Sequence, residues 1–424
     1  MKATIPPIKG TRDFYPVDMA VRTWLYNTIR RVSEMFGYQE YEGPLLESID
    51  LYAAKSGEEL VNQQSFVFPD RGGDMITLRP ELTPTLARMV AQRQRQLTYP
   101  LRWWSWGPFW RYERPQKGRG REFFQWNIDL VGANSPEADA ELVAIAVTFF
   151  KEVGLAPQQI NILVGNRQLM DAQFEQLGIP PAQRPEVLRL IDRRDKMAPD
   201  QWDANAGELG LDAAQLAGLK ARLQDLELWR QSPDLVRFFA AIRALGVSEY
   251  VRFAPQIIRG LQYYTGTVFE AWDMAGEFRA LFGGGRYDNL ISDVGGEPLG
   301  GVGFAMGDMV ISLVLQKFGC LPGDLEASPA PVLVTVFDEA SFPASFALAA
   351  ELRRAGLGVA CYPEPAKLAR QIKYADRMGM RVVAVLGPDE QAAGQVNLKD
   401  LRSGAQQPVA RAAVAEAIRR ILEK

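Results

Sequence analysis

The sequence contains no histidine and only two cysteines, Cys320 and Cys361, among its 424 residues. The missing imidazole excludes a Ser-His-Asp triad, a Cys-His dyad and an HExxH zinc site. Two cysteines are too few for a disulfide framework or a cysteine-based zinc site. If the chain is an enzyme, it must use carboxylates, guanidiniums, phenols and a metal held by oxygen ligands. Such groups suit catalysis by positioning and by charge stabilisation.

Long apolar runs and targeting signals are lacking as well. No apolar run approaches the roughly 18 residues that span a bilayer. The first ten residues, MKATIPPIKG, have neither the apolar core of a secretory signal nor the composition of an Arg- and Ser-rich leader. We therefore expect a cytoplasmic protein with no membrane partner. The net charge of −3 gives no global basic field that would indicate nucleic acid.

The length of the chain allows roughly two to four domains with substantial cores. Residues 17–36 have apolar side chains at helical spacing and predict an amphipathic helix, and residues 136–153 predict another. Residues 166–250 are mostly helical in pattern and contain no motif typical of a functional site. We expect them to form a helical domain inserted between two parts of one domain, residues 1–165 and 251–322.

The last quarter of the chain has a different organisation. A Pro/Gly/Ser-rich linker, LPGDLEASPAP at residues 321–331, precedes it. From 331 to 424 the pattern alternates strand, helix, strand, helix and strand, and it ends in a further helix. This alternation is typical of a small α/β domain with a mainly parallel sheet.

The stretch GPFWRYERPQKGRGREFFQWNIDL, residues 107–130, predicts a β-hairpin with a cationic loop. Side chains alternate faces along a strand, so Gln125, Asn127 and Asp129 share one face with Phe123, opposite an apolar face. The plainer interpretation is a surface hairpin whose loop charges are simply solvated. An inward row of polar side chains is costly without a ligand, however, so the pattern favours an open antiparallel sheet that binds a triphosphate. The loop cations are Arg114, Lys117, Arg119 and Arg121.

This stretch resembles motif 2 of the class II aminoacyl-tRNA synthetases, in the version of the histidyl-tRNA synthetase family. KGTRDFYP, GYQEYEGPLLE, TLRPELTP, RGLQYYTGTVFEAW, GGGRYDNL and GVGFAMG are similar to further family segments in the same order, and the segment from KLARQIKYADRMGM onward resembles the anticodon-binding domain. The resemblance covers nearly the whole chain. It implies an α/β protein with an α+β core: a class II antiparallel sheet flanked by helices, a helical insertion and a C-terminal α/β anticodon-binding domain.

The resemblance implies ATP ligands around the hairpin. Arg111 falls where the family grips the α-phosphate and the substrate carboxylate. Glu113 and Arg119 fall where it holds the adenine and the outer phosphates, and Phe123 where it stacks on adenine. Arg259 opens the histidine-specific motif and would stabilise charge on the α-phosphate during attack. Taken alone, Arg259 is explained equally well by a salt bridge at the end of a strand.

Two groups of side chains would surround a substrate histidine, again by resemblance. Those at the α-amino group are Glu81, Thr83 and Gln125. Those at the imidazole are Asp129, Tyr264 and Tyr263, while Arg111 and Arg259 complete the set at the carboxylate. Many family members carry glutamate where this chain has Asp129. Because aspartate is shorter by one methylene, the pocket must be narrower by about that length, while the negative charge is the same.

Motif 3 departs from the usual family pattern. In class II enzymes it commonly ends in a Glu-Arg pair whose arginine holds the γ-phosphate. Here Gly307 is followed by Asp308, Met309 and Val310. The sequence does not show how the γ-phosphate is held, and Arg286 in GGGRYDNL is a candidate substitute or neighbour.

The resemblance implies an enzyme that activates L-histidine with ATP and Mg²⁺ and transfers it to tRNA(His), working as a homodimer formed through motif 1. No protein ligand for the metal is indicated. Two alternatives stay open. One is a catalytically silent paralogue that regulates histidine biosynthesis, which the missing motif 3 arginine favours; the other is a tRNA-binding scaffold. The helical insertion is expected to clamp the tRNA acceptor arm, although a helical brace explains its pattern almost equally well.

Overall fold

The computed structural model describes residues 4–53, 63–194, 197–258, 263–323, 325 and 330–423. The chain forms two compact units, one of residues 1–13 and 25–321 and the other of residues 14–24 and 322–424. The helix expected over residues 17–36 is α1, Pro16–Met35. Within the described part of the chain, no helix is both long and apolar enough to cross a membrane.

The first unit is built on an eight-stranded sheet that is mainly antiparallel, as the class II resemblance implied. Its strands lie in the order β1, β5, β6, β11, β10, β9, β7, β8, and the pairs at the two edges are parallel. The strand bounds are Gln39–Glu40 for β1, Leu101–Trp110 for β5, Glu122–Val131 for β6, Gly301–Gly307 for β11, Phe282–Tyr287 for β10, Thr267–Asp273 for β9, Ile160–Asn166 for β7 and Val251–Phe253 for β8.

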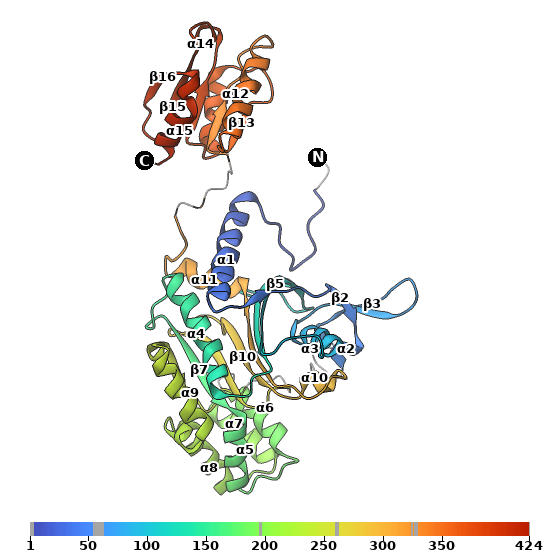
Figure 1. Ribbon diagram of the computed structural model, residues 1–424. Helices are drawn as coiled ribbons and strands as arrows, with labels where there is room; N and C mark the ends of the chain where they lie inside the picture. The colour runs from blue at the N-terminus through green and yellow to red at the C-terminus, as the bar shows by residue number, and fades with distance from the viewer. Residues whose placement is uncertain are drawn as a thin grey trace. The chain divides into compact units, whose positions relative to one another are not determined.

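The predicted hairpin is confirmed, because β5 and β6 pair antiparallel along their full length. One face of β6 is apolar, and its Trp126 ring lies 5.5 Å from the Phe149 ring of α4 (Pro136–Glu152), measured between centroids. Helix α4 covers this face of the sheet, while α3 (Thr83–Arg93) and α10 (Leu290–Asp293) lie toward the other face (Figure 1). The polar row of the hairpin therefore faces α3 and α10.

A three-stranded sheet of β2 (Leu46–Ser48), β4 (Met75–Leu78) and β3 (Phe66–Pro69) precedes α3 in the chain, with the short helix α2 (Asp50–Ala53) between β2 and β3. The sequence pattern of GYQEYEGPLLE predicts a single strand that ends at Gly43-Pro44, because proline cannot donate to a ladder. In the structure this segment is instead divided between two sheets, since β1 contains only two residues and β2 begins after the proline.

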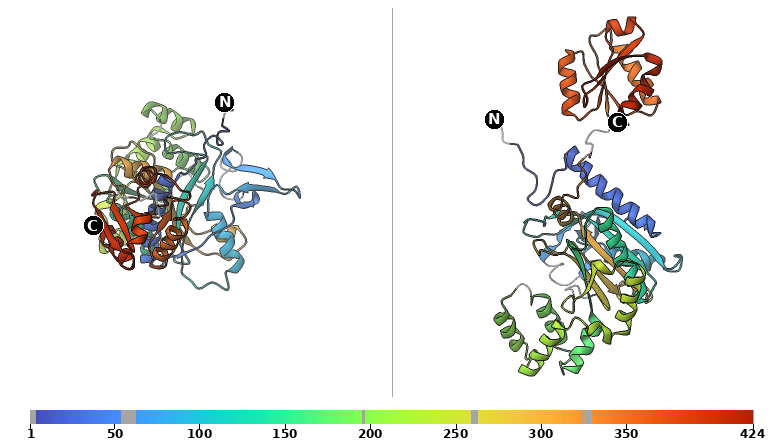
Figure 2. Two further views of the ribbon diagram at one scale, coloured as in Figure 1. Left: turned by 90° about the horizontal axis from the view of Figure 1, so that it is seen from above. Right: turned by 90° about the vertical axis from the view of Figure 1, so that its left-hand side faces the viewer.

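Five α-helices occupy the described residues between β7 and β8, and they gather at one end of the sheet (Figures 1 and 2). They belong to the same compact unit as the sheet. Helix α9 is joined to α4 by an exposed ion pair between Arg237 and Glu137. The helix bounds are Arg167–Gln176 for α5, Arg184–Asp192 for α6, Pro199–Glu208 for α7, Ala213–Gln224 for α8 and Pro233–Ala244 for α9.

The second unit contains a five-stranded sheet with helices on both faces, as the right-hand view of Figure 2 shows. The strand order is β13, β12, β14, β15, β16. The prediction of a mainly parallel sheet is wrong, since β14–β15 and β15–β16 pair antiparallel and only the other two of the four described pairings are parallel. The bounds are Val332–Val334 for β12, Phe342–Arg354 for α12, Val359–Cys361 for β13, Leu368–Arg377 for α13, Val382–Val385 for β14, Pro388–Ala392 for α14, Gln395–Asp400 for β15, Gln406–Ala410 for β16 and Val414–Leu422 for α15.

Candidate active site

The polar row of β6 is buried in the structure. Gln125, Asn127 and Asp129 are all nearly inaccessible to solvent. The neighbouring strand β11 makes room for them, because a Cβ atom added to Gly303 would stand 2.0 Å from the Asp129 Oδ1 atom. The absence of a side chain at Gly303 of GVGFAMG therefore gives the Asp129 carboxyl its place on this face of the sheet.

Asp129 is held by a tyrosine that the sequence analysis did not assign. The Tyr287 hydroxyl, from β10, donates a hydrogen bond to Asp129 Oδ1 at 2.7 Å. Burial raises the pKa of Asp129 to about 7, and the Tyr287 hydrogen bond limits that rise. Burial and the nearby Asp129 raise the pKa of the Tyr41 phenol well above its ordinary value. The result is a carboxyl group that ionises near neutral pH inside a pocket of phenols.

A signal in the sequence could have found Tyr287. A Cβ atom added to Gly301 would lie 2.5 Å from the Tyr287 ring, just as one added to Gly303 would collide with Asp129. Glycine at two alternate positions of one strand indicates that bulky side chains from the neighbouring strands lie across it. The partner strands could not be known from the sequence alone.

Glu81 and Tyr263 meet although they are distant in the sequence. The Tyr263 hydroxyl donates to Glu81 Oε2 at 3.2 Å, and the Tyr52 hydroxyl donates to the Glu81 backbone carbonyl at 3.3 Å. Tyr263 and Tyr264 pack with their ring centroids 4.7 Å apart, and both are buried. Thr83 begins α3, two residues after Glu81. The residues assigned to the amino group and to the imidazole thus come from α3, β6 and the segment before β9.

Arg111 and Phe123 lie at the loop end of the hairpin, beside the last paired residues of β5 and β6. Arg111 Nε donates to the Pro80 carbonyl at 2.9 Å, and its guanidinium carbon lies 5.4 Å from the Phe123 ring centroid. Phe123 stacks on Phe109 at 6.1 Å, and Phe109 in turn faces the buried guanidinium of Arg79 at 4.5 Å. Cations flank a pair of rings, an arrangement that favours a planar ligand at this point.

Arg79 was not assigned a role from the sequence. Its Nη1 atom lies 2.5 Å from Glu42 and also donates to the Gly43 carbonyl at 3.1 Å. Its side chain is fully buried. Its Nε atom donates to the Pro108 carbonyl of β5 at 3.0 Å. This buried arginine therefore fixes the segment after β4 against the hairpin, and the TLRPELTP motif is the signal that could have singled it out.

The hairpin loop is not simply solvated. Glu113, whose side chain is largely buried, forms an ion pair with Arg119. The Arg121 guanidinium lies over the Tyr112 ring at 4.1 Å, and the Lys117 ammonium lies 5.3 Å from the centroid of the Phe278 ring. The loop cations therefore have defined places on the protein surface, as a phosphate site requires.

The start of α11 (Asp308–Lys317) explains part of the motif 3 departure. Asp308 is buried; it accepts a hydrogen bond from the Phe124 backbone N–H at 2.9 Å and pairs with Arg12 of KGTRDFYP at 2.7 Å. Val310 lies close to the hairpin loop, since a Cβ atom added to Gly118 would be 3.3 Å from its Cγ2 atom. A valine thus stands against the loop, at the position where the family usually has an arginine.

Arg279, in the connection between β9 and β10, brings a further cation to this end of the site. Burial and the positive charge of Arg119 lower the pKa of the Arg279 guanidinium, while Glu113 raises it. Arg279 therefore lies within electrostatic range of the Glu113–Arg119 pair. The sequence analysis did not assign it, and its isolated position in the sequence offered no signal.

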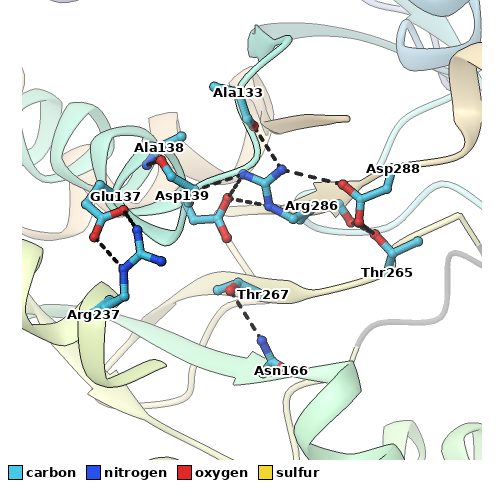
Figure 3. A network of polar contacts seen from close by, with 11 residues as sticks. Ala133, Glu137, Ala138, Asp139, Asn166, Arg237, Thr265, Thr267, Arg286 and Asp288 are labelled. Atoms are coloured by element: carbon cyan, nitrogen blue, oxygen red, sulfur yellow. Dashed lines mark hydrogen bonds and ion pairs between the residues drawn. The ribbon is translucent and has the colours of Figure 1, made fainter. Parts of the chain in front are cut away.

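Arg286 does not replace the motif 3 arginine. It is 8% exposed, and its Nε atom donates to Asp139 at 2.9 Å (Figure 3). Its other nitrogens donate to the carbonyls of Ala133 at 3.0 Å and Ser135 at 3.2 Å. A guanidinium with these partners is already committed to the protein, and our suggestion that it holds a phosphate is corrected. Arg259 lies outside the described residues.

Comparisons with known proteins match nearly the whole chain. The family model for histidyl-tRNA synthetase matches residues 10–309, and that for the anticodon binding domain matches residues 331–421. A histidine–tRNA ligase of Leptospira biflexa is 36% identical over 414 residues, which are 95% of this chain and 94% of the relative. The chloroplastic/mitochondrial histidine–tRNA ligase of Arabidopsis thaliana is 38% identical over 416 residues, 96% of this chain and 85% of the relative. Among solved structures, a histidyl-tRNA synthetase from Nostoc aligns with a TM-score of 0.82 at 28% identity, covering 99% of this chain and 100% of that one.

Proposed function

Because this chain belongs to the histidyl-tRNA synthetase family, we propose that it activates L-histidine with ATP to histidyl-adenylate and transfers the histidine to the 3′ end of tRNA(His). The observation that carries this proposal is the buried Asp129 carboxyl, held by Tyr287 at 2.7 Å on the same face of the hairpin as Gln125. A basic ring such as imidazole matches a carboxyl group that ionises near neutral pH.

The amino-acid pocket is polar at both ends. In our proposal Glu81, with Thr83 and Gln125, binds the cationic amino group, and Asp129 with Tyr264 binds the imidazole. The Gln125 Oε1 atom is buried with no hydrogen-bond partner among the described residues, which supports a ligand N–H at this point. A site that hydrogen-bonds an imidazole rejects analogues without those groups by roughly 10⁴–10⁵, so no editing domain is needed.

The activation step needs no general base. An oxygen of the ionised histidine carboxylate attacks the α-phosphorus, a P–O bond forms, and the bond to pyrophosphate breaks with its electron pair leaving on pyrophosphate. Arg111 and Arg259 stabilise charge on the α-phosphate, Phe123 stacks on adenine, and Glu113 and Arg119 hold the adenine and the outer phosphates. The terminal ribose hydroxyl of the tRNA then attacks the carbonyl carbon, and AMP leaves.

Mg²⁺ suits the site as an ion carried by ATP. Among the described residues there is no group of three or more metal-binding side chains. Mg²⁺ commonly binds through substrate phosphates with one or two carboxylates, and Glu113 is the carboxylate beside the loop cations. When bound, the ion neutralises charge on the phosphates.

We also propose the partners of the other regions. The second unit binds the anticodon end of the tRNA, as its match to an anticodon binding domain supports. The helical insertion contacts the acceptor arm. A homodimer forms through the motif 1 region, which is supported by exposed apolar side chains on the small sheet: Leu46, Phe68 and Met75 are 46%, 40% and 46% exposed. We expect the protein to act in the cytoplasm.

The missing motif 3 arginine favours a second candidate function, that of a catalytically silent paralogue that regulates histidine biosynthesis. Histidine-dependent exchange of labelled pyrophosphate into ATP, run with and without Mg²⁺, separates the two. Exchange that requires histidine and Mg²⁺ supports the synthetase. Histidine binding without exchange would favour the paralogue. Binding of tRNA with neither histidine binding nor pyrophosphate exchange would favour a scaffold. Charging of tRNA(His) is the second measurement.

A further inference from the structure

The helical insertion begins beside the predicted histidine pocket. Strand β7 ends at Asn166, and α5 starts at Arg167. Asn166 caps the helix, because its Oδ1 atom accepts a hydrogen bond from the Leu169 N–H at 2.9 Å. Its Nδ2 atom donates to the Thr267 hydroxyl on β9 at 3.4 Å (Figure 3). The junction between sheet and insertion is thus attached to β9, the strand that forms the second half of the histidine-specific motif.

The Arg167 side chain joins the residue just before that motif to a residue within it. Its Nε atom donates to the Ile258 carbonyl at 3.0 Å, and its Nη1 atom donates to the Tyr264 carbonyl at 2.9 Å. Its backbone N–H donates to the Gly266 carbonyl at 3.0 Å. One residue therefore fixes the backbone on both sides of residues 259–262, a stretch outside the described residues.

A second set of contacts holds the same segment from β10. The Thr265 N–H donates to the Arg286 carbonyl at 2.8 Å, and its hydroxyl donates to Asp288 at 2.5 Å. Arg286 is itself tied to Asp139 of α4 (Figure 3). Tyr264 is consequently held by Arg167 on one side and by the neighbouring Thr265 on the other. The β10 contacts are internal to the sheet, whereas Arg167 comes from the insertion.

We infer that Arg167 is a positioning residue for the histidine pocket. It sets the backbone of Ile258 and Tyr264, and through them the places of the Tyr263 and Tyr264 rings relative to Glu81 and Asp129. The inference rests on the proposed function, because it concerns the same pocket. An arginine suits this role since its planar fork can donate to two carbonyls at once, which the single ammonium of lysine does less well.

A positioning role and a merely structural role differ in what they change. Loss of pocket geometry raises the histidine KM and lowers kcat, but it leaves ATP binding at the other end of the hairpin unaffected. Loss of general stability lowers the midpoint of thermal unfolding without a preference for one substrate. A rise in the histidine KM without a rise in the ATP KM therefore indicates a positioning role, whereas no preference between the two indicates a structural one.

The experiment compares Arg167→Ala and Arg167→Lys with the wild-type chain in pyrophosphate exchange, with histidine and ATP varied separately. For Arg167→Ala we expect a histidine KM raised about tenfold and a lowered kcat, with the ATP KM unchanged, because small misplacements in a site are costly. Arg167→Lys should be intermediate. Guanidinium chloride at low concentration should partly restore Arg167→Ala, and thermal unfolding is recorded for each variant.

Arg237→Ala is the matched control. Arg237 lies on the same insertion, pairs with Glu137 at 2.7 Å, and is solvent-exposed (Figure 3). It should match the wild-type chain in both KM values, and guanidinium should not change it. Equal loss toward histidine and ATP, no change in either Arg167 variant, or a failure of guanidinium to restore activity would overturn the inference. Absence of exchange in the wild-type chain would instead count against the proposed function.

Discussion

Two buried aspartates in the first unit, Asp129 and Asp139, are compensated in different ways. Both are nearly inaccessible, and burial raises the pKa of the first to about 7 and of the second to about 6. Asp139 lies 2.5 Å from the Arg286 guanidinium, which opposes the rise. Asp129 accepts a hydrogen bond from the neutral Tyr287 phenol and forms no ion pair among the described residues.

In our proposal this difference separates a structural charge, Asp139, from a ligand-binding one, Asp129. A buried charge with a fixed counter-ion contributes to the architecture, and removing one partner leaves the other uncompensated. A buried carboxyl without a counter-ion is poised for a ligand cation. The hairpin loop has the complementary arrangement, since Arg119 and Arg279 both lie near the one carboxylate of Glu113. Each end of the site carries the charge opposite to that of its proposed ligand.

The largest expected effect comes from breaking the compensated pair. Asp139→Asn leaves the buried Arg286 with only the longer pair to the partly exposed Asp288, at 3.5 Å, and should lower the free energy of unfolding by about 3 kcal/mol. Urea unfolding followed by tryptophan fluorescence measures this. The double variant Asp139→Asn with Arg286→Met should recover most of the loss, since no buried charge is then left alone. Equal losses in the single and double variants would contradict the assignment.

The corresponding change at the uncompensated carboxyl should affect function rather than stability. Asp129→Asn removes the charged acceptor for the imidazole, so kcat/KM for histidine should fall about 10- to 100-fold. The ATP KM should not change, and the free energy of unfolding should not fall. Burial holds the Asp129 pKa above its unfolded value, so the wild-type chain loses stability from this group as pH rises from about 4 to about 7. Asp129→Asn should lack this pH-dependent loss of stability. Urea unfolding of both proteins at several pH values tests this.

At the cationic end, Arg279→Gln should raise the ATP KM about tenfold, because it removes a cation beside Glu113 and Arg119, where we propose that the outer phosphates bind. The histidine KM should stay constant. Arg230→Gln is the control, since Arg230 is an exposed arginine of the insertion that pairs with Glu227. Pyrophosphate exchange at varied ATP measures both variants. An unchanged ATP KM for Arg279→Gln would remove it from the phosphate site.

The smallest effect concerns the pH profile. The Tyr287 hydrogen bond lowers the pKa of Asp129, so Tyr287→Phe should move the ionisation of that carboxyl to higher pH. We expect kcat/KM for histidine to rise with pH through about 7 in the wild-type chain, and Tyr287→Phe to need a higher pH, with about a twofold loss at neutral pH. The titration of free histidine is the same for both proteins, so the difference between their profiles belongs to Asp129. Superimposable profiles would show that Tyr287 does not tune it.

Local patterns in the sequence identified much of this site. The alternation of Phe123 to Asp129 is enough to place a polar row on one face of a hairpin, and the helical period over 136–153 is enough to predict α4. In both cases the information lies within one element. The family resemblance then named the ligands that those elements carry.

What the sequence could not show depends on contacts between distant segments. Tyr287 meets Asp129 across β11, and Arg167 reaches Ile258 and Tyr264 from the other end of the insertion. Arg286 was misjudged for the same reason, because its partner Asp139 lies on a different element. Strand β16 was missed because QQPVA has no clear apolar alternation. Its antiparallel pairing with β15, a contact between two elements, holds this segment as a strand.

Strand β11 has a consequence for the range of ligands that the pocket can admit. The strand has no side chains at positions 301 and 303, so no change of rotamer there can make room for a larger ligand. More depth could be gained only by moving the Asp129 carboxyl itself, which sits 2.0 Å from where a Gly303 side chain would begin. In our proposal the same group therefore exerts size selection and charge selection, so a ligand too large for the histidine site would also lose its ionic partner.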